Sequence, residues 1–160
     1  MDNSFCSSAV LAECGPAQCR WRCALEVIDE LLARRTGVSG DEVDHLLELR
    51  WHLRQGSHPE AALRFFCDLR LRMEQRHYLA FFRIRRWLEN HLVAIVRASP
   101  EAPARVVPVS LSFYCVEAIR RATLCAAGRQ EALCAPRLVF AFRGQPEENQ
   151  QAAAVSTAAA

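Results

Sequence analysis

The sequence contains no lysine: its 160 residues include 20 basic ones, and all of these are arginine. Arginine codons are rich in G and C, so this bias indicates a GC-rich coding sequence, as small viral genes often have. No apolar run approaches the roughly 18 residues that a membrane-spanning helix needs. The first residues have neither a basic flank nor an apolar stretch long enough for a secretory signal. We therefore expect a cytoplasmic protein without a transmembrane anchor, and not a secreted one.

Enzyme motifs are also missing. The sequence has no glycine-rich phosphate loop, no nucleophile elbow and no HExxH zinc motif. Its acidic pairs, Asp41–Glu42 and Glu147–Glu148, fall in a predicted helix cap and in the C-terminal tail, where carboxylates are ordinary. We therefore expect a protein that is not an enzyme and carries no cofactor.

The cysteines number eight, and four of them lie within the first 23 residues. Thiolates are good zinc ligands, but the spacing here lacks paired CxxC knuckles and no histidine lies nearby. Disulfides are not expected in a reducing compartment. We expect thiols that act as small apolar side chains and no metal site, with zinc binding by the N-terminal cysteines left open. The eight are Cys6, Cys14, Cys19, Cys23, Cys67, Cys115, Cys125 and Cys134.

Composition favours a single folded domain. Apolar residues make up 51% of the chain and charged residues 24%, enough to build a core, and the net charge of +2 implies no polyanionic partner by itself. We expect a flexible arm over residues 1–19, a helical domain over residues 20–143 and a disordered tail over residues 144–160.

Helix boundaries are marked clearly in the first half of the chain. Apolar residues recur at helical spacing from Trp21 to Arg35, and Gly37 is placed to end that helix. Ser39-Gly40-Asp41-Glu42 has the form of a capping box and opens a second helix, which Gly56 ends. Ser57-His58-Pro59-Glu60 predicts another capping box with proline in the first turn.

The stretch from Glu60 to Ala98 has no glycine or proline and a helical pattern throughout. We expect a break between Arg70 and His77, because one helix of that length is long for a compact domain. The second half, Tyr78 to Val96, is apolar on most of its circumference, which predicts the most buried helix of the domain. Phe82, Ile84 and Leu88 should then be buried.

The last third of the chain is less regular. We expect a loop from Ser99 to Pro108 and a helix from Ser110 to Ala127, whereas the apolar run Arg137–Phe142 fits a strand or a helix equally well. Together these elements predict an all-α fold, a compact helical bundle around an apolar central helix.

Short motifs in this bundle resemble those of the Bcl-2 family of apoptosis regulators. Tyr78-Leu79-Ala80-Phe81-Phe82-Arg83-Ile84 resembles the run that opens the central helix of that family, and Gly40-Asp41-Glu42-Val43 resembles its Gly-Asp core. The stretch from Val107 to Ile119 is similar to the next helix of viral members. Where the family has Asn-Trp-Gly-Arg, this sequence has Glu74-Gln75-Arg76-His77.

The resemblance implies a Bcl-2-like fold and a non-enzymatic, viral-type inhibitor of apoptosis, peripheral to mitochondria. Such a protein sequesters amphipathic helices of pro-apoptotic host proteins in an apolar groove, with one charge pair to set the register. The cation for that pair is expected at Arg76 or His77, at the start of the central helix. The predicted groove residues are Leu46, Leu47, Phe65, Phe66, Leu69, Leu71, Arg76, His77, Ala80 and Phe81.

A second interpretation starts from the arginines. On one unbroken helix, five of them would lie along one side and form a basic stripe that follows a phosphate backbone. The protein would then be an RNA-binding accessory protein that suppresses silencing or host defence. The same side chains are also ordinary on a helix surface, paired with acidic residues. The five are Arg72, Arg76, Arg83, Arg86 and Arg97.

Overall fold

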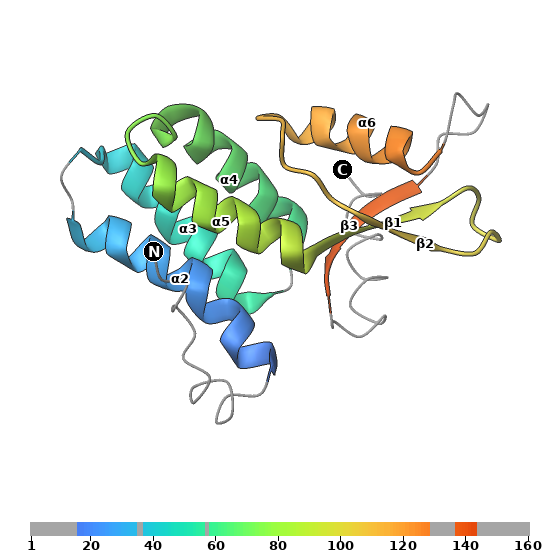
Figure 1. Ribbon diagram of the computed structural model, residues 1–160, viewed down its shortest axis with the longest axis horizontal. Helices are drawn as coiled ribbons and strands as arrows, with labels where there is room; N and C mark the ends of the chain where they lie inside the picture. The colour runs from blue at the N-terminus through green and yellow to red at the C-terminus, as the bar shows by residue number, and fades with distance from the viewer. Residues whose placement is uncertain (1–15, 35–36, 57, 129–136, 144–160) are drawn as a thin grey trace, which may run out of the picture.

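The fold is mixed α/β, so the all-α prediction is wrong. The computed structural model describes residues 16–34, 37–56, 58–128 and 137–143, which form five helices and one three-stranded antiparallel sheet (Figure 1). Four helices gather at one end of the molecule, and the sheet lies with the fifth helix at the other end. In chain order the elements are α2 (Pro16–Arg34), α3 (Gly40–Gln55), α4 (Pro59–Met73), α5 (Tyr78–His91), β1 (Leu92–Arg97), β2 (Arg105–Pro108), α6 (Val116–Ala126) and β3 (Arg137–Phe142).

The sheet has the order β2-β1-β3, and its central strand is the part of the predicted central helix that is not helical. Ala94 on β1 is the register partner of Val107 on β2 and of Phe140 on β3. All but two residues of β1, Ile95 and Arg97, are buried. A strand covered on both faces is apolar at nearly every position, and so is a buried helix. Helix α5 and strand β1 therefore look like one continuous helix in the sequence, although the helix ends at His91.

The predicted loop and last helix are also corrected. Ser99–Pro108 contains β2, and α6 starts at Val116 rather than at Ser110. The residues before α6 are held outside a helix by side chains: the backbone N–H of Leu111 donates to Glu89, 2.8 Å away, and its carbonyl accepts from Arg70. The run Arg137–Phe142, which the sequence allowed as either a strand or a helix, is strand β3.

Local signals in the helical half predicted most helix ends. The capping box at Ser39 and Glu42 is formed, and α3 ends at Gly56, whose φ of 65° is the left-handed conformation that favours glycine. The predicted break is confirmed, since α4 ends at Met73 and α5 begins at Tyr78. Two details differ: α2 begins at Pro16, and the N-cap residue of α4 is His58, whose side chain makes no capping hydrogen bond. Ser57, on which the second predicted capping box depends, lies outside the described residues.

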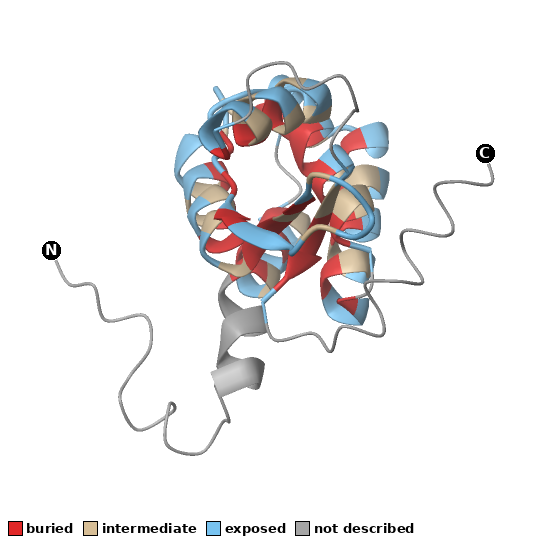
Figure 2. Ribbon diagram, turned by 90° about the vertical axis from the view of Figure 1, so that its right-hand side faces the viewer, coloured by how far each residue is buried: buried red, intermediate tan, exposed pale blue. Residues whose placement is uncertain are grey.

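Helix α5 is not the most buried helix, because α4 is more buried. Helix α4 buries eight of its 15 residues, whereas α5 buries four of 14. Ile84 and Leu88 are in the core as predicted, but Phe82 is 45% exposed, Tyr78 59% and Leu79 74%. Figure 2 shows the buried segments on the inner sides of the helices and along the sheet. The first turns of α5 therefore present apolar side chains to solvent.

Several expectations concern residues that the structure does not describe. Residues 1–15 of the predicted arm and the predicted tail lie outside the described ranges, as do Cys6, Cys14 and Cys134. Cys19 and Cys23 lie on α2, before the first residue of that helix whose side chain the structure describes. Among the described side chains Cys67 is buried, Cys115 and Cys125 are exposed, and these three are free thiols. The described residues include no group of three or more side chains placed to hold a metal ion. None of the described helices is long and apolar enough to cross a membrane.

Two leucines on α4 give a matched test of this fold. Leu69 is fully buried and Leu71 is 72% exposed. Leu69→Ala should lower the free energy of unfolding by about 2–5 kcal/mol, because it leaves a cavity in the core. Leu71→Ala should change it by less than about 0.5 kcal/mol. Urea unfolding followed by circular dichroism checks both values, and equal losses would contradict the placement of α4.

Candidate functional site

A pocket of about 340 Å³ lies between α2 and the first turn of α5. Its floor is apolar, because Val27 and Leu31 of α2 are at most 4% exposed. Tyr78, Leu79 and Ala80 line the α5 side. The two helices that form it pack side by side in Figure 1. We call this pocket, with the exposed apolar side chains of α5 beside it, the α2–α5 groove.

The α5 side of the groove continues as an apolar surface beyond the pocket. The rings of Tyr78 and Phe82, one helical turn apart, are stacked with their centroids 6.3 Å apart. Leu79, between them in sequence, is 74% exposed. Exposed apolar side chains scattered singly are normal, but a contiguous group next to a pocket is typical of a binding site.

Polar groups form the rim, and they differ in how fully they are paired. Glu30 pairs with Arg83 across the two helices at 3.5 Å. Arg34 lines the pocket and makes no ion pair or hydrogen bond with the described residues. The Nε2 atom of His77 is buried and finds no hydrogen-bond partner among them. The rim therefore offers one unpaired cation and one unsatisfied imidazole nitrogen.

The turn between α4 and α5, residues 74–77, forms one end of the groove, and Arg76 ties it to α3. The Arg76 guanidinium contacts the Glu42 carboxylate and the carbonyl of Gly37, and it also donates to the carbonyl of Arg72 at 3.3 Å. Glu42 accepts from the backbone N–H of Ser39 at 2.8 Å, so its carboxylate caps α3 at the same time. Burial of Glu42 raises the pKa of its carboxyl, but the bonds from Ser39 and Arg76 outweigh burial and hold that pKa below the usual value.

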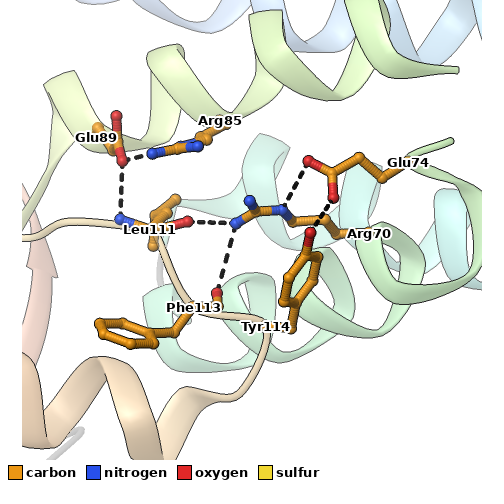
Figure 3. Close-up of polar contacts among 7 residues, drawn as sticks. All are labelled: Arg70, Glu74, Arg85, Glu89, Leu111, Phe113 and Tyr114. Atoms are coloured by element: carbon orange, nitrogen blue, oxygen red, sulfur yellow. Dashed lines mark hydrogen bonds and ion pairs between the residues drawn. The ribbon is translucent and has the colours of Figure 1, made fainter.

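Arg70 holds the other side of this turn (Figure 3). Its side chain is 5% exposed, and its guanidinium donates through Nε to Glu74 at 3.1 Å. The Tyr114 hydroxyl donates to the second oxygen of Glu74 at 2.6 Å, and its ring lies beneath the guanidinium, 4.3 Å from ring centroid to Cζ. Burial raises the pKa of Glu74, but the bonds from Tyr114 and Arg70 lower it further than burial raises it.

The same guanidinium reaches the segment before α6. Arg70 donates through Nη1 to the carbonyls of Leu111 and, at 3.5 Å, Phe113. Glu89 accepts from the N–H of Leu111 and, at 3.2 Å, from Arg85 (Figure 3). Every side chain in this cluster is matched by a partner within the fold. The cluster is thus a structural clamp, and it contains no pair of nucleophile and base.

The structure separates the predicted groove residues into three groups. Four lie in the core with at most 1% exposure: Leu46, Phe66, Leu69 and Phe81. Leu47 and Leu71 are exposed on α3 and α4, and Phe65 packs against the rings of His45 and His52. The remaining three, Arg76, His77 and Ala80, line the α2–α5 groove.

The other wall of the groove was missed in the sequence. Val27, Leu31 and Arg34 follow one another at helical spacing on one face of α2, and this pattern was visible. What the sequence did not show was that this face packs against the start of α5.

The five arginines of the proposed basic stripe do not lie on one helix. Arg72 is on α4, Arg76 in the turn, Arg83 and Arg86 on α5, and Arg97 at the end of β1. Arg76 and Arg83 are paired with Glu42 and Glu30. The alignment calculated for an unbroken helix therefore does not apply.

The ion pair of Arg76 with Glu42 predicts a pH dependence of stability. A folded-state pKa below the ordinary 4.5 means that the unfolded chain takes up the proton first, so this contribution is present above pH 4.5 and is lost as the pH falls below it. Glu42→Gln should lower the free energy of unfolding at pH 7 by about 1 kcal/mol, since solvent screens the half-exposed arginine.

Urea unfolding between pH 7 and pH 3 measures this effect. The Glu42→Gln profile should be flatter than that of the wild type. Asp44→Asn, which changes an exposed carboxylate on the same helix, should keep the wild-type profile. Identical profiles for Glu42→Gln and the wild type would contradict the role of this pair.

Comparison of the chain with models of known protein families, with curated proteins and with solved structures finds no match.

Proposed function

We propose that this protein is a non-enzymatic binding protein that holds an amphipathic helix of a partner protein in the α2–α5 groove. The observation that carries the proposal is the group of exposed apolar side chains Tyr78, Leu79 and Phe82 beside a pocket with Val27 and Leu31 at its floor. An amphipathic helix offers apolar anchors at i, i+3 or i+4 and i+7, which match an apolar floor and wall of this kind.

Charge on the rim supports a partner helix with an acidic residue. Arg34 is unpaired within the described part of the chain, and the buried nitrogen of His77 needs a hydrogen-bond partner. A carboxylate on the bound helix would pair with Arg34, which lines the pocket. Such charge-assisted bonds contribute about 1.5–3 kcal/mol when they are shielded from water.

The narrower function within this class is inhibition of apoptosis by a viral-type protein that sequesters pro-apoptotic helices. Its support is that Tyr78–Ile84, the run that resembles the opening of the Bcl-2 central helix, includes the exposed wall of the groove. It draws no support from the fold, because the sheet replaces the second half of the central helix. Nucleic-acid binding has no comparable feature, since the arginines of the stripe lie on separate elements.

Calorimetric titration with a panel of amphipathic helical peptides, each with one central aspartate, tests the proposal. The wild-type protein should bind at least one peptide with a dissociation constant of tens of micromolar or less. Leu79→Ser should weaken binding by about tenfold or more, because it removes an apolar contact from the wall. Ala80→Leu should weaken it by filling the pocket, and Arg34→Glu by repelling the aspartate.

Leu71→Ser is the matched control. Leu71 is as exposed as Leu79, at 72% against 74%, but it lies on α4 and does not line the pocket. Arg76→Glu is less informative, because it would also break the pair with Glu42 that caps α3. No binding by the wild-type protein, or equal losses with Leu71→Ser and Leu79→Ser, would refute the proposal.

A further inference from the structure

Three histidines and two aromatic residues form a continuous row of rings where α3 and α4 meet. The ring of His45 lies against Phe65 at 5.7 Å, and Phe65 stacks on His52 at 5.5 Å. His52 contacts both His58, at 5.7 Å, and Trp51, at 4.8 Å. Trp51 and His58 are parallel to within 11°, with centroids 6.3 Å apart. We call these five residues the histidine–aromatic row.

His52 is the centre of the row and is poorly placed to carry a proton. Its Nδ1 atom is buried and has no hydrogen-bond partner among the described residues, and its Nε2 atom is 4.0 Å from Glu48. Burial lowers the pKa of His52 most, the neighbouring His58 lowers it further, and Glu48 opposes both. Its position in the last turn of α3 also favours a cation, so it acts in the same direction as Glu48.

His58 joins the row to the start of α4. It is the N-cap residue of α4, at the positive end of that helix, and its side chain makes no capping hydrogen bond. The nearest acidic residue on α4, Glu60, is already paired with Arg64 and Arg120. On α3, Arg54 adds another positive charge two residues after His52, and Arg50 is paired with Asp29 of α2. Among the described residues, Glu48 is the acidic side chain that acts on His52.

We propose that the histidine–aromatic row is a pH-sensitive latch that holds α3 against α4 when its imidazoles are neutral and loosens when they are protonated. Neutral rings stack on Phe65 and Trp51 with little cost in desolvation. Protonation places two cations in contact at a ring separation of 5.7 Å, one of them largely buried. The latch acts at mildly acidic pH and is independent of the helix-binding function.

The direction of the pH effect follows from linkage. His52 has its ordinary pKa of 6.5 in the unfolded chain and a lower one in the fold, so the unfolded chain binds the proton first. The contribution of neutral His52 to the free energy of unfolding is therefore fully present above pH 6.5, and it decreases as the pH falls below that value. Each unit of pKa lowering multiplies the unfolding equilibrium constant by about tenfold once the pH is below both values. The carboxylates of Glu42 and Glu74 act only below pH 4.5, so the two windows are separate.

The first measurement is a proton NMR titration of the histidine Cε1–H signals in the wild-type full chain, which needs no variant to fold. The His52 signal should titrate below pH 6.5. Fluorescence of Trp51, assigned by Trp51→Phe, should change over the same range, because protonated imidazole quenches a tryptophan in contact with it. Titration of His52 at or above pH 6.5 would overturn the proposal.

The second measurement is the urea midpoint at pH 7.5 and at pH 5.5. The wild-type midpoint should be lower at pH 5.5, and His52→Phe, which keeps the stack on Phe65 and removes the titrating group, should reduce this difference. His91→Phe is the matched control: His91 stacks on Trp87 at 4.3 Å, away from the row, so its removal should leave the difference unchanged. An undiminished difference in His52→Phe, or the same reduction in both variants, would refute the latch.

Discussion

The buried guanidinium of Arg70 is the constraint on which the arrangement of the two ends of this molecule depends. A buried charge is costly unless its N–H groups are matched by acceptors, and removal of one partner leaves the others unsatisfied. Arg70 finds its acceptors in the turn after α4, at Glu74, and on the backbone of the segment between β2 and α6. The helical end is thereby fixed to the segment that leads out of the sheet.

This clamp also positions the candidate site. Glu74, oriented by Arg70 and Tyr114, is the first residue of the turn that ends in His77, and Arg76 in the same turn is tied to the capping box of α3. With the turn held from both sides, α5 starts at a fixed place against α2. The first apolar residues of α5 then remain exposed beside the pocket, although apolar side chains are usually buried in the core.

The sequence predicted those structural features that are determined by residues close together along the chain. The capping box of α3, the glycine at its end and the break before Tyr78 are local signals, and each was found from residues a few positions apart. Leu92–Arg97 was misread because a central strand and a buried helix share the same apolar composition, and only the partners β2 and β3 distinguish them. The groove was found only in part, since its α2 wall meets α5 through tertiary packing. The contact of Arg70 with Leu111 spans 41 positions, beyond any local pattern.

Amide hydrogen exchange in Arg70→Met tests most directly whether the clamp supports the groove. Loss of the guanidinium should speed exchange both in residues 109–115, which it binds, and in residues 74–80, which form the end of the groove. Arg72→Met, a change of an exposed arginine two residues away, should alter neither segment. Faster exchange confined to residues 109–115 would show that the groove does not depend on Arg70 and would contradict this account.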